Sequence, residues 1–255
     1  YSKFIHNKSK LLITDPTSAE IIKYASNAFL AAKISFVNEI TSISHVVNGN
    51  IADVSKGMGM DPRIGRLFLK AGPGYGGSCF PKDVKALDYL AKENDLVLPI
   101  ISNIEKSNLQ TKKRLLERVN RYFETTPKTK RRITIYGISF KANTDDIRDS
   151  ASIFFLKRLK RLGYKINLYD PIISGSPQKD RIHGLWFSCP YEASKDSDLL
   201  IVMNDSKEFL ELDYKKISSS MRLKSIMDFR NLLDKNLLIT SGFSQIFMLD
   251  EDVFT

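Results

Sequence analysis

The second half of the sequence alternates short apolar runs with a helical pattern, and this alternation restricts the fold more than any other feature. Apolar runs typical of buried strands occur at 132–139 (RITIYGIS), 164–171, 196–205 and 223–230. Between the first two runs, the segment SASIFFLKRLKRLG has the period of an amphipathic helix that ends at Gly163. Strands that alternate with helices predict a parallel sheet, so we expect an α/β domain here.

The first half of the sequence is expected to be helical. Apolar residues recur at helical spacing from Ile21 to about Val47. Further helices are expected at 51–56, 81–93 and 99–123, and residues 1–12 are expected to form a strand or a lead-in segment. The long helix is apolar over more than one stripe, which indicates a central element that packs against a second copy of the chain. We therefore expect a homodimer formed through residues 18–48.

Together these patterns predict an α/β protein with an all-helical central dimerisation domain followed by a parallel-sheet, Rossmann-like domain. The segment ETTPKTKRR separates the two patterns and is typical of a domain boundary. The expected domains are therefore residues 1–125 and 126–255.

Composition restricts the partners of the chain. The formal charge is +10, which favours anionic partners, but the lysines are scattered rather than striped. This favours a phosphorylated small molecule, and we expect no nucleic-acid partner. No apolar run reaches the ~20 residues of a membrane span, so no membrane association is expected. Cys79 and Cys189 match neither a metal-site spacing nor a disulfide framework, so we expect no metal and a reducing cytoplasmic location.

The stretch AGPGYGGSCFPKD, residues 71–83, places Cys79 between a glycine-rich turn and Pro81. Proline suits the first turn of a helix, and the positive end of the helix dipole favours the reactive thiolate. The stretch therefore predicts a mounted nucleophile. Asp83 follows four residues later, where its carboxylate could take a proton or orient a water. The alternative is that Asp83 only complements the helix N-terminus.

Lys23 and Asn27 share a face of the long helix that is otherwise apolar. They could be functional, or they could be a snorkelling lysine and an interface asparagine. Arg63 and Lys70 flank the glycine-rich segment, where backbone amides can approach a ligand closely. The alternative is a flexible linker, although the aromatic residues Tyr75 and Phe80 are unusual in linkers.

The segment FKANTDDIRDS, residues 140–150, follows the first strand and opens a helix. Ligands bind at this position in open α/β sheets, so Lys141 and Arg148 could hold phosphates or ribose hydroxyls. A charged surface loop is the alternative. The segment lacks G-x-G-x-x-G, and so does the rest of the chain, so the sequence contains no standard dinucleotide fingerprint.

Three segments of the chain, EIIKYASNAFLAAKISFVNEI, GMDPRIGRLFLKAGPGYGGSCFPKDVKAL and FKANTDDIRDS, resemble the UDP-glucose/GDP-mannose dehydrogenase family. The similarity is collinear over essentially the whole chain. It implies that the second domain binds UDP, and that the family's N-terminal NAD-binding domain is absent. Ser78 and Phe80 favour UDP-glucose over UDP-N-acetylaminosugars and GDP-mannose. Phe229 stands where the family usually has glycine before Arg230.

The resemblance implies an NAD-dependent, two-step oxidation of UDP-glucose to UDP-glucuronate through a cysteine thiohemiacetal and a thioester. Without the N-terminal domain the isolated chain is expected to be inactive. One alternative is a non-catalytic UDP-sugar-binding or oligomerisation remnant. Another is the same chemistry on GDP-mannose or UDP-N-acetylmannosamine.

The resemblance also implies a role for individual residues. Cys79 would attack the aldehyde, Lys23 would stabilise the oxyanion, Asn27 would position substrate and water, and Asp83 would help to activate the hydrolytic water. The implied substrate-binding residues are Lys23, Asn27, Arg63 (from the partner subunit), Phe68, Leu69, Lys70, Tyr75, Gly76, Phe140, Lys141 and Arg230. The residues expected to meet NAD are Cys79, Lys82 and Arg148.

Overall fold

A computed structural model describes residues 11–124 and 131–251 of the chain. The first part is helical, with α1 at Pro16–Val46, α2 at Ile51–Met60, α3 at Phe80–Glu93 and α4 at Pro99–Tyr122. Proline stands in the first turn of α1, α3 and α4, where its missing N–H costs no helical hydrogen bond. The predicted helices are confirmed, although α2 extends four residues beyond its expected end.

The second part forms a six-stranded, fully parallel sheet in the order β3-β2-β1-β4-β5-β6. Its strands are β1 Arg132–Tyr136, β2 Lys165–Tyr169, β3 Leu185–Trp186, β4 Leu199–Val202, β5 Ser225–Asp228 and β6 Gln245–Met248. Its helices are α5 Ala151–Arg161, α6 Pro190–Ser194, α7 Tyr214–Ser220 and α8 Lys235–Thr240, with short 3₁₀ turns at 173–175, 177–181 and 207–210. The predicted α/β class is confirmed; β3, β6 and α6 to α8 were not predicted.

The sheet is the middle of three layers. One face carries Ile133, Ile135 and Leu168, which pack against apolar residues of α4 and α5 such as Val119 and Phe155. The other face carries residues such as Tyr136 and Leu200, which pack against α6, α7 and α8. Because both faces are covered, the residues of β4 and β5 are all buried and those of β1 are buried after Arg132, as expected for a parallel sheet.

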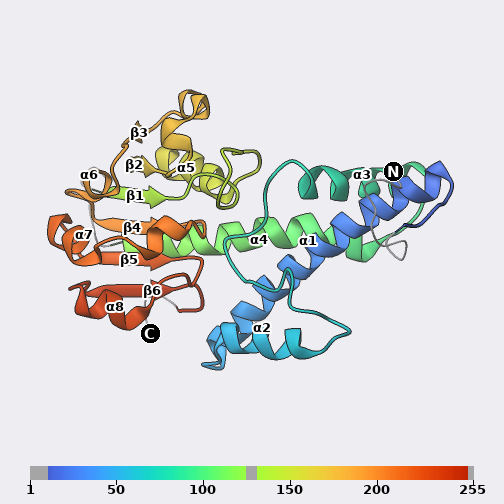
Figure 1. Ribbon diagram of the computed structural model, residues 1–255, viewed down its shortest axis with the longest axis horizontal. Helices are drawn as coiled ribbons and strands as arrows, with labels where there is room; N and C mark the ends of the chain where they lie inside the picture. The colour runs from blue at the N-terminus through green and yellow to red at the C-terminus, as the bar shows by residue number, and fades with distance from the viewer. Residues whose placement is uncertain (1–10, 125–130, 252–255) are drawn as a thin grey trace.

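Helix α4 belongs to both parts of the molecule. Its first half packs in a small apolar cluster with α1 and α3, and its second half covers one face of the sheet. Figure 1 shows α4 running from the helical part into the α/β part, and it shows the carboxyl ends of the strands facing the helices. The carboxyl ends of the strands therefore lie next to the segment between α2 and α3 (Figure 1).

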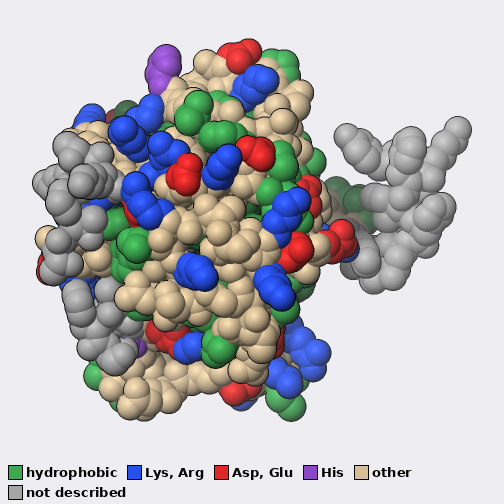
Figure 2. All heavy atoms as spheres, turned by 90° about the vertical axis from the view of Figure 1, so that its left-hand side faces the viewer, with side chains coloured by type: hydrophobic (Ala, Val, Ile, Leu, Met, Phe, Trp, Pro, Cys, Tyr) green, Lys and Arg blue, Asp and Glu red, His purple; other side chains and the backbone are tan. Residues whose placement is uncertain are grey.

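The opposite end of the sheet, at the amino ends of the strands, carries lysine and arginine side chains interspersed with acidic ones (Figure 2). Within the described ranges, no helix is long and apolar enough to cross a membrane. Residues 1–10 and 125–130 lie outside the described residues. The expected lead-in segment therefore falls mostly outside them, as does most of the expected domain boundary, which stays a prediction.

Candidate active site

The Cys79 thiol is exposed at the amino end of α3. Its carbonyl accepts the first hydrogen bond of the helix, from the Asp83 amide at 2.9 Å, and Phe80 and Pro81 form the first turn. The Ser78 hydroxyl lies 3.7 Å from the sulfur. The structure therefore has the exposed cysteine at a helix start that the sequence predicts.

Lys23, Asn27 and Asp83 come together between α1 and α3. The Asn27 amide donates to Asp83 Oδ2 at 2.6 Å, and the Lys23 ammonium lies 3.1 Å from the same oxygen. The Asp83 side chain is fully buried, whereas that of Lys23 is 55% exposed. Lys23 and Asn27 of α1 therefore contact the buried carboxylate of Asp83, while the Lys23 ammonium stays at the surface.

The ionisation of this cluster follows from these contacts. Burial opposes ionisation of Asp83, but hydrogen bonds from Asn27 and Lys23 outweigh it and hold the pKa of the carboxyl below its usual value. The hydrogen bond to Asp83 raises the pKa of Lys23, and the nearby charge of a Cys79 thiolate acts in the same direction. Lys23 is therefore a cation at neutral pH beside the cysteine.

The glycine-rich loop packs tightly against the segment that follows β1. The Gly77 amide donates to the Arg148 carbonyl at 2.7 Å, and Gly77 has a φ of +84°. A β-carbon at Gly77 would lie 2.8 Å from the Phe140 ring, and one at Gly76 would lie 2.6 Å from the Asp149 carbonyl oxygen. Glycine is required at both positions, because any side chain would separate the loop from the α/β domain.

Three polar residues of helix α4 hold the same loop and the segment after β1: Glu105 and Asn108 bond to the loop, and Lys112 bonds to the segment. Asn108 accepts from the Tyr75 amide at 2.9 Å and donates to the Tyr75 carbonyl at 3.1 Å. Glu105 accepts from the Tyr75 hydroxyl at 3.0 Å, and the buried Lys112 ammonium donates to the Asp149 carbonyl at 3.2 Å. These bonds fix the backbone just before Cys79, so the loop is an ordered structure and not a flexible linker.

A cavity of about 280 Å³ lies between the glycine-rich loop and the carboxyl ends of β1 and β4. Phe80, directly after Cys79, is part of its wall. Seven of the predicted substrate-binding residues line it: Phe68, Lys70, Tyr75, Gly76, Phe140, Lys141 and Arg230. Phe68 has a φ of +64°, which is costly for a bulky residue and is typical of functional loops.

The charge around this cavity is positive. The Lys70 ammonium and the Arg230 guanidinium both contact Asp205 Oδ2, at 3.2 and 3.0 Å. Burial opposes the ionisation of Asp205, but the charges of Arg230 and Lys70 outweigh it and lower the pKa of that carboxyl. Three cations (Lys70, Lys141 and Arg230) against one carboxylate (Asp205) leave a net charge of +2 at neutral pH. The cavity is therefore suited to a doubly charged anion.

The remaining predicted residues lie outside this cavity. Arg63 is 88% exposed and pairs with Asp61 at 2.6 Å, so it does not reach the cavity of its own chain. Leu69 is buried and lines an adjoining cavity of about 260 Å³, which shares Lys70 and Arg230 with the first. Lys23 and Asn27 belong to the cluster beside Cys79.

Phe229, which precedes Arg230, is packed in the apolar core. Its ring is fully buried 5.8 Å from the Phe155 ring, and the Arg118 guanidinium lies 5.4 Å from its centre. Among the described residues, Phe229 does not have a positive φ. Where the resemblance led us to expect glycine, Phe229 packs between β5, α4 and α5.

The described residues do not form a complete dinucleotide site. At the turn after β1, a β-carbon at Gly137 would lie 2.4 Å from the Asn204 side chain, so side chains fill the space there. The candidate NAD contacts are surface residues: Lys82 lies 3.6 Å from Asp83, and Arg148 pairs with Asp146 at 2.7 Å. Among the described residues, no cluster of His, Cys, Asp and Glu could hold a metal ion.

Two groups of site residues were not predicted from the sequence. Asn204 and Asp205 follow β4 and line the cavity, as do Ser139 and Ser150 beside the first strand. Asp205 was detectable, because polar residues directly after a buried parallel strand lie at the ligand-binding edge. Asn108 and Lys112, which form the second group, were not detectable, because nothing in the sequence pattern of α4 shows which of its polar residues are buried.

Comparison with known proteins assigns both parts of the chain. The central domain of the UDP-glucose/GDP-mannose dehydrogenase family matches residues 17–110, and its UDP binding domain matches residues 134–235. A UDP-glucose 6-dehydrogenase of Rickettsia conorii is 38% identical over 236 residues, which are 92% of this chain and 54% of that protein. The chain thus spans about half the length of such relatives.

Solved structures agree with this assignment. A UDP-glucose dehydrogenase from the archaeon Pyrobaculum islandicum has a TM-score of 0.78 at 27% identity, covering 93% of this chain and 51% of that one. A GDP-mannose dehydrogenase from Pseudomonas aeruginosa has a TM-score of 0.58 at 27% identity, covering 91% and 53%. The chain belongs to the UDP-glucose/GDP-mannose dehydrogenase family, of which it carries the central and UDP-binding domains.

Proposed function

We propose that this chain is the substrate-binding and nucleophile-bearing half of an NAD-dependent UDP-glucose 6-dehydrogenase, which oxidises UDP-glucose to UDP-glucuronate. One observation supports this most directly: a cationic cavity, walled by aromatic rings, lies beside an exposed cysteine at a helix start. The diphosphate would be bound by Lys70, Lys141 and Arg230. The sugar would extend past Phe80 toward Cys79.

The cysteine and its neighbours would handle the aldehyde formed by the first oxidation. The Cys79 thiolate would form a carbon–sulfur bond to the carbonyl carbon, and the carbonyl electron pair would move to oxygen. The Lys23 ammonium, exposed beside Cys79, would stabilise that oxyanion. Asn27 would orient the sugar and the hydrolytic water. Asp83 is buried, so it would act on that water through Asn27 and Lys23.

When bound, NAD+ supplies the hydride-accepting chemistry of each oxidation. The chain's own contribution there would be limited to the surface formed by Cys79, Lys82 and Arg148. We therefore propose that the 255-residue chain is inactive alone. The complete enzyme would be cytoplasmic and would hold its dinucleotide mainly through residues outside this segment. Failure of the N-terminal half of a relative, added in trans, to restore NADH formation would favour a non-catalytic UDP-sugar-binding module.

We propose further that the chain forms a homodimer through α1. Ile22, Phe29, Phe36 and Ile43 are all exposed and stand seven residues apart, so they share one face of the helix. An exposed apolar stripe of this length is typical of a helix that packs against another protein. Arg63, exposed on its own chain, would then reach the cavity of the partner.

The substrate is tested by calorimetric competition between UDP-glucose, GDP-mannose and UDP-N-acetylmannosamine for the chain. The proposal predicts that UDP-glucose binds most tightly, and tighter binding of either competitor would reassign the substrate. The nucleophile is tested in the enzyme reconstituted with the missing half. There Cys79→Ser should block uronate formation after the first oxidation or trap a covalent adduct, and unchanged uronate formation would remove Cys79 from the mechanism.

A further inference from the structure

The turn after β5, which carries Arg230 into the cavity, is built by a buried carboxylate. Asp228 accepts hydrogen bonds from the amides of Arg230, Leu232 and Leu233, at 2.9, 2.7 and 2.8 Å. The next residue after Arg230 is Asn231, whose φ of +45° lies in the left-handed region. The course of the backbone past Arg230 therefore depends on how Asn231 is held.

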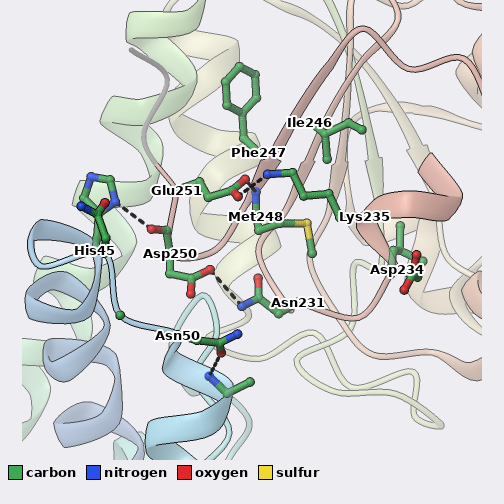
Figure 3. A pocket seen from close by; sticks show the side chains of 14 residues that line it. His45, Asn50, Asn231, Asp234, Lys235, Ile246, Phe247, Met248, Asp250 and Glu251 are labelled. Atoms are coloured by element: carbon green, nitrogen blue, oxygen red, sulfur yellow. Dashed lines mark hydrogen bonds and ion pairs between the residues drawn. The ribbon is translucent and has the colours of Figure 1, made fainter. Parts of the chain in front are cut away.

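The Asn231 side chain is held by the end of the chain's last described strand. Its amide nitrogen donates to Asp250 Oδ1 at 3.2 Å, and its carbonyl oxygen accepts from the Leu249 amide at 2.7 Å. Both polar ends of the asparagine are thus used. Figure 3 shows Asn231 and Asp250 facing each other across the wall of a hollow of about 670 Å³.

Asp250 also reaches the helical domain. Its Oδ2 accepts from the Ile51 amide, the first of α2, at 3.4 Å, where the helix dipole favours a negative charge. Its backbone carbonyl accepts from His45 Nδ1 at 2.7 Å, near the end of α1. Asp250 is therefore in contact with both α1 and α2 on one side and with Asn231 on the other (Figure 3).

A second anchor fixes the same strand end. The buried Arg118 guanidinium of α4 donates to the carbonyl oxygens of Met248 and Leu249, both at 2.7 Å. This contact sets where the backbone before Asp250 lies. The carboxylate of Asp250 is thus presented to Asn231 from a rigid support.

The Arg230 side chain itself has few contacts that would fix it. Its guanidinium contacts Asp205, and its Nε atom is buried without a hydrogen-bond partner among the described residues. Its Nη1 atom lies 2.3 Å from where a β-carbon of Gly72 would stand, so the guanidinium rests on the glycine-rich loop. A small shift of the backbone at Arg230 would therefore break the contact with Asp205 or press the side chain into the loop.

We propose that Asp250, acting through Asn231, is a positioning residue for Arg230, and that the two form a latch between the helical domain and the nucleotide cavity. The consequence for nucleotide affinity rests on the proposed function, in which Arg230 binds the diphosphate. The latch makes that affinity depend on the contact between α2 and the end of β6.

The latch itself is tested without any nucleotide. In the ¹⁵N spectrum of the 255-residue chain, the buried Nε–H of Arg230 gives a signal that is identified by its loss in Arg230→Lys. Asp250→Ala should shift or broaden this signal, and Asp250→Asn, which keeps an acceptor oxygen, should largely restore it. Lys235→Met is the matched control, because Lys235 lines the same hollow but makes its contact with Glu251. An Arg230 signal unchanged in Asp250→Ala would overturn the proposal.

The consequence for binding is tested by calorimetry with UDP. Asp250→Ala should weaken UDP binding by about tenfold, the scale of one hydrogen bond to a charged group. In the Arg230→Ala background the same substitution should have no further effect, because its action passes through Arg230. An equal loss in both backgrounds would overturn the positioning role. Absence of UDP binding to the unaltered chain would contradict the proposed function instead, and the spectroscopic result would still decide the latch.

Discussion

Replacing Asp83 tests whether the cluster beside Cys79 is held by its buried carboxylate. Asp83→Asn keeps the shape of the side chain. It removes the negative charge that accepts the hydrogen bond from Asn27 and pairs with Lys23. An asparagine oxygen in the place of Oδ2 can still accept from Asn27 and Lys23, but it carries no negative charge, and the amide nitrogen in the place of Oδ1 then faces the Lys23 ammonium. The cluster should therefore lose its charge-assisted contacts without leaving a cavity.

The expected size follows from the burial of each partner. The Asn27 bond, at 2.6 Å to a fully buried carboxylate, belongs to the class worth about 1.5–3 kcal/mol. The Lys23 side chain is more than half exposed, so solvent screens its ion pair and the pair adds little to stability. We expect Asp83→Asn to cost about 2 kcal/mol, which lowers the melting temperature by about 4–8 °C in a chain of this size.

The assay is chemical or thermal unfolding of the chain at two pH values, with Asp88→Asn as the control. Asp88 is on the same helix and pairs with Lys92, but the Lys92 side chain is 71% exposed, so the control should lose less than about 0.5 kcal/mol. The pKa of Asp83 is lowered by folding, so its stabilisation is complete above its unfolded pKa and is lost as the pH falls through the folded value.

The difference between the unaltered chain and Asp83→Asn should therefore be largest at neutral pH. It should shrink as the pH falls below about 4, the unperturbed carboxyl value. A difference that stays constant with pH, or that is no larger than that of Asp88→Asn, would refute the argument that an ionised Asp83 organises Lys23 and Asn27.

Two further substitutions test the packing and the assembly. Gly77→Ala should cost about 3 kcal/mol, since it adds left-handed strain and a clash with Phe140. Gly163→Ala has the same φ but open space around it, so it should cost only about 1 kcal/mol in the same unfolding assay; equal losses would contradict the packing argument. Phe29→Glu with Phe36→Glu should convert the proposed dimer to a monomer in light scattering, and an unchanged mass would remove α1 from the interface.

The sequence was most informative where burial has a simple period. The strands that became β1, β2, β4 and β5 lie in predominantly apolar runs, and α1 has an unbroken helical pattern. Strand β3 has only two residues, and β6 lies at the edge with partly exposed residues, so neither has a strong pattern. Helices α6 to α8 have five to seven residues, too few to show a period.

The site was predicted in part for a related reason. Glycines, the cysteine and the proline restrict local backbone geometry, so the loop before α3 could be interpreted from its residues. The partners of that loop come from α4 and from the turns after β1, β4 and β5, which are distant in sequence. That Asn108 faces Tyr75, or that Asp250 faces Asn231, depends on how elements distant in the sequence pack within each part of the molecule, which no local pattern encodes.

The most direct test of the account is calorimetric binding of UDP-glucose to the 255-residue chain, beside Arg230→Ala and Lys70→Ala. The account predicts binding by the unaltered chain and at least about tenfold weaker binding in each variant, since each removes one cation from the cavity. Absence of binding, or binding that neither substitution weakens, would contradict the claim that this cavity holds the sugar nucleotide.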